Sequence, residues 1–131
     1  MKIVPDTNVL ARIIVEDEPT QSRIAKKQLD DAETVAVGTA SLCELVWVLS
    51  KIYKRPAPDI ARAIRMLIHA ENVVVNAPAV EAGLAVLDAG GDFADGAIAV
   101  EGLQLGGEVF VSFDRRAGAI LKSHGLPVAK L

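Results

Sequence analysis

Four acidic residues stand at the ends of short apolar runs or near the starts of amphipathic segments, where side chains can be gathered for chemistry. Asp6 and Asp114 each follow a short apolar run, and Glu44 and Asp95 lie near the predicted starts of two helices. Four carboxylates brought to one place repel one another unless cations hold them together. Carboxylate oxygens are also the ligands that Mg²⁺ prefers. The set therefore predicts a divalent-metal enzyme.

Each acid also has a purely structural interpretation. Asp is common in turns and helix caps, so Asp6 fits a cap as well as it fits a ligand. Thr7 or Asn8 could equally cap the helix that follows it. Asp114 is followed by Arg115 and Arg116, and a structural ion pair is the competing hypothesis there. Ser112, two residues earlier, points to the same face of the predicted strand and could assist Asp114.

Glu44 has the strongest structural alternative. Ser41-Leu42-Cys43-Glu44 matches the capping box, in which a Glu side chain accepts a hydrogen bond from the amide at the N-cap. Glu44 also lies off the main apolar stripe of its predicted helix, although Trp47 and Val48 flank it. Taken by itself, this residue is better explained as a cap. A helix that is apolar on most of its circumference further predicts a second cover, such as another subunit.

Asp95 shares the start of its helix with Asp92. Asp92 suits the N-cap and Asp95 the third helical position, where the helix dipole stabilises negative charge. One acid is enough to cap the helix. The second is surplus, and Asp95 is therefore the better candidate for a metal ligand.

Strand-like and helix-like segments alternate along the whole chain and are expected to position these acids. This alternation predicts an α/β domain, with a parallel sheet covered by helices on both faces. Pro5 cannot donate to a sheet ladder, so the first strand should already be leaving the sheet there. The expected strands are residues 3–4, 34–37, 73–75, 109–111 and 126–129. The expected helices begin near Asn8, Thr20, Ser41, Asp59, Pro78, Asp92 and Arg115.

Composition restricts the class of protein further. At 131 residues the chain is long enough for one domain, expected to span residues 1–131, and too short for two. No apolar run approaches the roughly 18 residues of a membrane span, and the start lacks a signal peptide, so we expect a cytoplasmic protein. Cys43 has no partner cysteine and is predicted to be a small buried hydrophobe. The net charge is −3, but without the four candidate acids 14 basic residues face 13 acidic ones.

Taken together, the motifs resemble those of a known family, the PIN-domain ribonucleases, and specifically the VapC-type toxins of prokaryotic toxin–antitoxin pairs. The matching stretches, in the family's order and spacing, are Asp6-Thr7-Asn8-Val9-Leu10, Thr39-Ala40-Ser41-Leu42-Cys43-Glu44, Asp92-Phe93-Ala94-Asp95-Gly96 and Val111-Ser112-Phe113-Asp114. Pro5 departs from the family's usual apolar residue, and Gly96 from its usual Ala. We expect the first to shift Asp6 slightly and the second to loosen the helix that carries Asp95.

The resemblance implies a three-layer α/β/α fold with about five parallel strands in the order 3-2-1-4-5. It also implies an endoribonuclease dependent on Mg²⁺ or Mn²⁺, with RNA as its substrate. Asp6, Glu44, Asp95 and Asp114 take the positions of an acidic quartet. The metal ligands are then Asp6, Asp95 and Asp114, and Glu44 serves the attacking water. Thr7 and Ser112 are secondary site residues. A small VapB-type antitoxin and a homodimer are the implied protein partners.

A basic stretch away from the acids is the candidate for gripping RNA. Lys51, Lys54, Arg55, Arg62 and Arg65 face only one opposing acid, Asp59. Arg62, Arg65 and His69 fall on one predicted helix face, which could follow a phosphate backbone. A solvated surface without a partner is the alternative for any one of these residues.

Three other functional classes were weighed. A phosphoacceptor receiver domain needs adjacent acids after the first strand, and here Thr7-Asn8 follow Asp6. A non-catalytic binding module of the same fold would not need all four acids. A metal-dependent nuclease outside any toxin–antitoxin pair, acting on DNA flaps or other phosphodiesters, fits the acids by themselves equally well.

Overall fold

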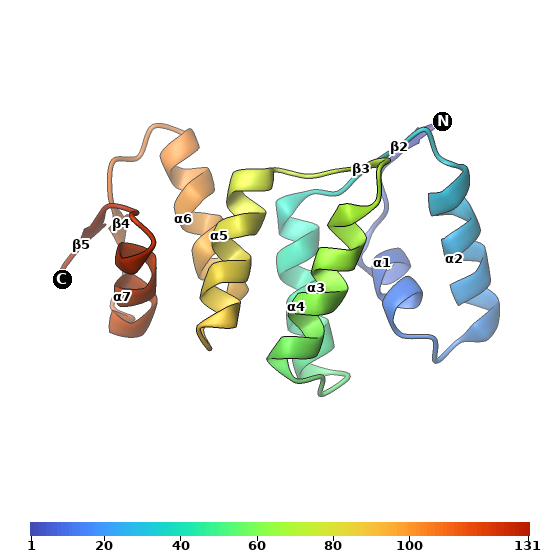
Figure 1. The fold of residues 1–131 in the computed structure, drawn as a ribbon, viewed down its shortest axis with the longest axis horizontal. Coiled ribbons are helices and arrows are strands. Elements are labelled where there is room, and N and C mark those ends of the chain that lie inside the picture. The colour runs from blue at the N-terminus through green and yellow to red at the C-terminus, as the bar shows by residue number, and fades with distance from the viewer. The chain divides into compact units, whose positions relative to one another are not determined.

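A computed structural model describes all 131 residues of the chain. The chain divides into two units at the junction of Val75 and Asn76. Unit 1 comprises residues Met1–Val75 and unit 2 comprises residues Asn76–Leu131. Each unit has its own small parallel sheet and its own helices (Figure 1). The predicted α/β class and the alternation of strands with helices are confirmed.

Unit 1 pairs its three strands in the order β1-β2-β3, all parallel. Val35, at the centre of the middle strand, is completely buried and pairs with Ile3 on one side and Val73 on the other. The β-branched residues of this strand suit the pleated, partly buried surface. The elements of unit 1 are β1 (Lys2–Ile3), α1 (Thr7–Ile14), α2 (Pro19–Asp31), β2 (Thr34–Ala36), α3 (Thr39–Lys51), α4 (Ala57–His69) and β3 (Val73–Val74).

The core of unit 1 is built on α3, which contacts both α1 and α4. Leu42, Leu45 and Leu49 recur at helical spacing and are almost completely excluded from solvent, together with Leu10 of α1 and Ile64 of α4. The predicted apolar stripe is therefore confirmed from Leu42 to Leu49, where it fixes the rotation of α3 about its own axis, whereas Ile52, just beyond the helix end, is 60% exposed.

Unit 2 consists of three helices and a two-stranded parallel sheet in which Phe110 pairs with Val128 and Val111 with Ala129. A small apolar cluster of Val86, Ala99 and Leu121 holds the helices to this sheet. The elements are α5 (Ala77–Asp88), α6 (Phe93–Gln104), β4 (Phe110–Val111), α7 (Arg115–Ser123) and β5 (Val128–Ala129).

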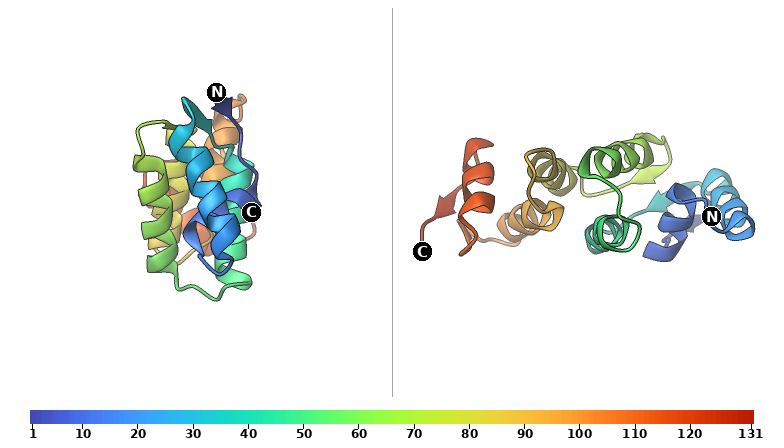
Figure 2. Two further views of the ribbon diagram at one scale, coloured as in Figure 1. Left: turned by 90° about the vertical axis from the view of Figure 1, so that its right-hand side faces the viewer. Right: turned by 90° about the horizontal axis from the view of Figure 1, so that it is seen from below.

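Helices α5 and α6 lie side by side in opposite directions (Figures 1 and 2). Two glycines let them approach closely. A Cβ atom at Gly96 would overlap the Ala82 carbonyl oxygen and lie 2.7 Å from the Gly83 nitrogen, both of them backbone atoms of α5. A Cβ atom at Gly83 would lie 2.7–2.9 Å from the buried ring of Phe93. Gly96 thus lets α6 pack against the backbone of α5, and the expectation that Gly96 loosens the helix carrying Asp95 stays a prediction.

The expectation of one five-stranded sheet in the order 3-2-1-4-5 is also wrong. The neighbours 3-2-1 and 4-5 occur as expected, but they form two separate sheets. The strands are only two or three residues long, so each contributes few ladder hydrogen bonds. Pro5 follows β1 directly after Val4 and has no N–H to donate, so the first strand cannot be extended as a ladder in that direction. Its predicted place, where the strand leaves the sheet, is confirmed.

Several local predictions near helix starts differ from the structure. Helix α1 is capped by Asp6, not by Thr7 or Asn8, and α2 by Glu18 instead of Thr20. Ile24 of α2 is 59% exposed, although it is apolar, because the buried face of α2 is taken by Ser22, Ala25 and Leu29. Cys43 is half-buried, not fully buried, and forms no disulfide. None of the seven helices is long and apolar enough to cross a membrane.

Candidate active site

Asp6 lies at the N-terminus of α1 and caps it. One carboxylate oxygen, Oδ1, accepts a hydrogen bond from the Val9 amide at 3.0 Å. The other oxygen makes no hydrogen bond and the residue is exposed, so it remains available to a ligand. Thr7, the first residue of the helix, is 7% exposed. Asp6 therefore caps α1 with one oxygen and leaves the other uncommitted, so the cap does not exclude the predicted ligand role.

Glu44 does not form the predicted capping box. Helix α3 begins at Thr39 after an N-cap at Gly38, which makes no side-chain hydrogen bond. Ser41 and Glu44 are consequently the third and sixth residues of the helix, too far along it to cap one another's amides. Glu44 is exposed and makes no hydrogen bond or ion pair. The helix start at Thr39 therefore excludes the capping explanation for Glu44, and the Glu44 carboxylate is not engaged in any cap.

Asp92 and Asp95 divide the start of α6 as the sequence predicted. Asp92 is the N-cap and accepts a hydrogen bond from the Ala94 amide at 3.1 Å. Asp95 is the third helical residue, and its carboxylate has no hydrogen-bond partner. Partial burial, followed by repulsion from Asp92 and Asp114, raises the pKa of Asp95 above its usual value. Asp95 is thus the surplus acid of this helix.

Asp114 caps α7 through Oδ1, which accepts hydrogen bonds from the amides of Arg116 at 3.0 Å and Ala117 at 3.1 Å. Ser112 orients this turn, because its Oγ accepts the Asp114 amide at 2.9 Å. Ser112 therefore contacts Asp114, as predicted, through the backbone amide of Asp114. The ion pair expected with the arginines is absent: the Arg116 guanidinium instead donates to the Ala89 carbonyl at 3.2 Å.

The four candidate acids fall into two pairs, one in each unit. Asp6 and Glu44 belong to unit 1, and Asp95 and Asp114 to unit 2. Within unit 2, Asp95 and Asp114 come close enough to repel each other, and Asp92 adds to this repulsion. Sequence reasoning treated Asp92 as a cap and left any further contribution open. In neither unit do three or more His, Cys, Asp or Glu side chains converge closely enough to hold a metal by themselves.

The basic stretch proposed for RNA belongs to unit 1 and is exposed throughout. Arg62 pairs with Asp59 one helical turn earlier. Lys54 adopts a left-handed backbone conformation, with a φ of 55°, in the turn between α3 and α4. Arg62 and His69 are exposed along α4, as the predicted phosphate-following face requires. The exposed basic residues of this stretch are Lys51, Lys54, Arg55, Arg62 and Arg65.

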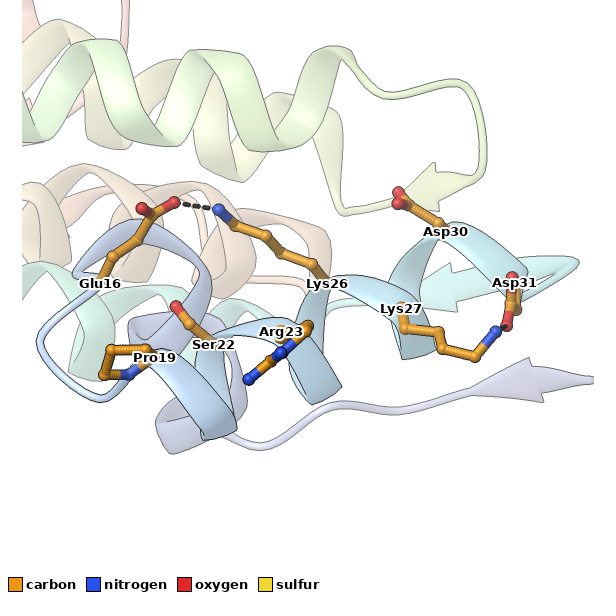
Figure 3. Close-up of a pocket in the computed structure, with 8 residues that line it drawn as sticks. All are labelled: Glu16, Pro19, Ser22, Arg23, Lys26, Lys27, Asp30 and Asp31. Atoms are coloured by element: carbon orange, nitrogen blue, oxygen red, sulfur yellow. Dashed lines mark hydrogen bonds and ion pairs between the residues drawn. The ribbon is translucent and has the colours of Figure 1, made fainter.

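Of two cavities in the structure, only one is lined by candidate site residues. A cavity of about 680 Å³ beside α2 contains none of the candidate site residues. Four of its six charged residues are paired, Lys26 with Glu16 and Lys27 with Asp31 at 2.8 Å, whereas Arg23 and Asp30 form no ion pair (Figure 3). The second cavity, of about 550 Å³, lies in unit 2 and is lined by both Ser112 and Asp114. Only this second cavity adjoins the candidate chemistry.

Comparison with known proteins identifies a PIN domain over residues 3–121. The match therefore includes all four candidate acids. No curated relative matches the chain.

Proposed function

This chain belongs to the PIN-domain family, whose members are generally metal-dependent nucleases, and from this premise we propose that it is a Mg²⁺-dependent endoribonuclease. Asp6, Glu44, Asp95 and Asp114 are its catalytic acids. Asp6 and Asp95 are the principal metal ligands, Asp114 completes the set, and Glu44 orients the attacking water. Residues 1–131 act as one nuclease domain, which the family match across both units supports.

The observation that carries this proposal is the surplus carboxylate of Asp95. Asp92 already caps α6, so the side chain of Asp95 is not needed as a cap. Partial burial and two neighbouring acids disfavour its charge. Such an arrangement costs the folded protein stability unless a cation offsets the repulsion. A divalent cation bound by Asp95 and Asp114 would offset this repulsion.

The donor chemistry of the four acids fits Mg²⁺ or Mn²⁺. All four offer carboxylate oxygens, the hard ligands that these ions take. Asp6 and Asp114 each use one oxygen for a helix cap and keep the other free, and Asp95 and Glu44 keep both. The caps hold Asp6 and Asp114 in a fixed orientation, which lowers the entropic cost of binding.

Bound there, the metal ion would neutralise charge on the scissile phosphate and make a water molecule a stronger nucleophile at neutral pH. The chain's own residues would do the rest. Glu44, which is exposed and uncommitted, would accept a proton from the attacking water. Ser112 would keep Asp114 in place through the backbone hydrogen bond at 2.9 Å. Thr7, buried beside Asp6, would act as a secondary site residue through its neighbour.

We propose in addition that the protein is a VapC-type toxin, inhibited by a small antitoxin. The RNA would be bound by the exposed basic residues of α3, α4 and their connection, which are Lys51, Lys54, Arg55, Arg62 and Arg65. Trp47 of α3 is 56% exposed, and this large apolar side chain supports a homodimer formed through α3.

Cleavage of a labelled RNA, followed with Mg²⁺ and with excess chelator, tests the nuclease. Asp95→Asn should lower the rate by at least about 100-fold, since loss of a residue that merely supports a ligand already costs 10- to 100-fold. Asp92→Asn is the matched control. It removes the same charge three residues away, and Asn still caps the helix, so activity should stay within a few-fold. Wild-type turnover of Asp95→Asn at saturating Mg²⁺ would refute the assignment.

The proposed homodimer is tested by a separate measurement of the oligomeric state. Sedimentation at micromolar concentration should show a dimer for the wild-type chain and a monomer for Trp47→Glu. A wild-type monomer would contradict the homodimer without affecting the nuclease.

A further inference from the structure

The 550 Å³ cavity of unit 2 lies beside Asp114 and is built from three consecutive parts of the chain. The turn after β4 contributes Ser112 and Phe113, helix α7 contributes Arg115 and Lys122, and the segment after β5 contributes Lys130. Arg115 and Lys122 are seven residues apart on α7, two turns along one helix face. Cavities of this size are typical of sites for small organic ligands.

The cavity concentrates positive charge in a unit that is acidic overall. Unit 2 contains seven acidic residues and four basic ones. Three of the four basic residues line the cavity, whereas Asp114 is the only acid that does so. Arg115, Lys122 and Lys130 are all exposed, and none of them makes an ion pair or a side-chain hydrogen bond. Uncompensated cations gathered at one cavity favour an anionic ligand.

Phe113 narrows the chemistry of that ligand. Its side chain is 90% exposed, although an aromatic ring of this size is normally buried. A phosphate or a carboxylate would gain nothing from the ring. A nucleotide would, because its base can stack on the ring while its phosphates contact the cations.

The floor of the cavity allows a flat group to approach closely. Gly118 and Ala119 lie between Arg115 and Lys122 on α7 and carry little or no side chain. A Cβ atom at Gly118 would lie 3.2 Å from Cγ1 of Val128, so the helix and β5 are already in near contact there. Small residues of α7 therefore line the cavity together with the cations and Phe113.

We propose that this cavity binds one unpaired nucleotide of a single-stranded RNA substrate, immediately beside the scissile phosphate. Phe113 stacks on the base, and Arg115, Lys122 and Lys130 contact the flanking phosphates. The inference rests on the proposed nuclease function, because it assigns the substrate of that same site. The proposal also implies that the RNA must be single-stranded at this position, because a base within a duplex is already stacked and paired and cannot turn onto Phe113.

Binding measured without catalysis tests the proposal. The full chain is titrated into a fluorescein-labelled single-stranded RNA hexamer in about 150 mM salt with excess chelator, and anisotropy is recorded. Loss of the stacking ring in Phe113→Ala should weaken binding roughly 5- to 100-fold, the range for one stacked base. Lys122→Ala and Lys130→Ala should each weaken binding and lower its dependence on salt, by about 0.7 in the log–log slope per lost phosphate contact.

Arg116→Ala is the matched control. It removes the one basic residue of unit 2 that does not line the cavity, so it changes the net charge equally and should leave affinity within about twofold. Ala119→Glu places a carboxylate in the cavity from an exposed helical position and should abolish binding. All five substituted residues are exposed, and melting curves verify that each variant folds.

Each outcome separates this inference from the proposed function. Unchanged binding by Phe113→Ala and the two lysine variants, or an equal loss in Arg116→Ala, overturns the nucleotide site and leaves the nuclease standing. Duplex RNA that binds as tightly as single-stranded RNA overturns it as well. Binding through the cavity without any Mg²⁺-dependent cleavage supports the nucleotide site and refutes the nuclease.

Discussion

Gly96→Ala should weaken the helix that carries Asp95, although Ala is the better helix former. The added Cβ atom would lie 2.7 Å from the Gly83 nitrogen and would overlap the Ala82 carbonyl. Both are backbone atoms, so no side chain can rotate away. Restoring an ordinary contact of 3.4 Å to the Gly83 nitrogen needs a separation of about 0.7 Å between α5 and α6, and the Ala82 carbonyl needs more. Such overpacking costs about 1–3 kcal/mol, and the helix propensity of Ala returns only about 1 kcal/mol.

We therefore expect Gly96→Ala to lose up to about 2 kcal/mol of unfolding free energy in urea titrations. Gly102→Ala is the matched control on the same helix. No atom lies within 4 Å of its added Cβ, so it should gain up to about 1 kcal/mol from propensity alone. The displacement of Asp95 should also slow RNA cleavage in Gly96→Ala, by up to about 100-fold. Equal stabilities of the two variants would refute the close packing of α5 and α6.

Further expectations concern the charged residues and one cap. Burial, Asp92 and Asp114 raise the pKa of Asp95, so the folded chain holds this proton more tightly than the unfolded chain, and stability falls as pH rises through that range. Asp95→Asn should raise the melting temperature of the metal-free protein at pH 7, and the gain should vanish near about pH 3. Mg²⁺ at about 100 times its dissociation constant should stabilise the wild type by about 2.7 kcal/mol and Asp95→Asn far less, as calorimetry can show. Glu44→Gln should change stability by less than about 0.5 kcal/mol but lower the cleavage rate by orders of magnitude; near-wild-type turnover would remove Glu44 from the site. Asn76→Ala should cost about 1–3 kcal/mol in urea titrations without changing the chemistry, because the Asn76 side chain caps α5 and bonds Gln104 at the end of α6 at 2.8 Å.

Local signals in the sequence located nearly every element. The Asp92 cap and the surplus Asp95 were predicted correctly, because capping depends on a few neighbouring residues. Pro19 at the start of α2 is a signal of the same local kind. The capping box at Ser41 and Glu44 failed for a reason outside its four residues. Helix α3 begins earlier, at Thr39, where the chain enters the buried interior of unit 1.

The acids show where prediction from sequence ends. Their places at the starts of α1, α6 and α7 follow from local preference, and so could be anticipated. The repulsion of Asp95 by Asp114 could not, because 19 positions separate the two residues and only the packing of unit 2 sets their separation. Whether Arg116 would pair with Asp114 or reach the Ala89 carbonyl depended on the same packing.

The sequence by itself determined the order of strands and helices, the positions of the four candidate acids along the chain, and the membership of the PIN-domain family. These depend on contacts within a few residues of one another and on motif order. Tertiary structure alone decided that the strands form two sheets, that Gly96 lets α6 pack against the backbone of α5, and that Lys130 shares a cavity with Asp114. The physical reason is that strands of two or three residues supply few ladder bonds. The position of distant segments then follows from the summed packing of many weak contacts, which no short stretch of sequence encodes.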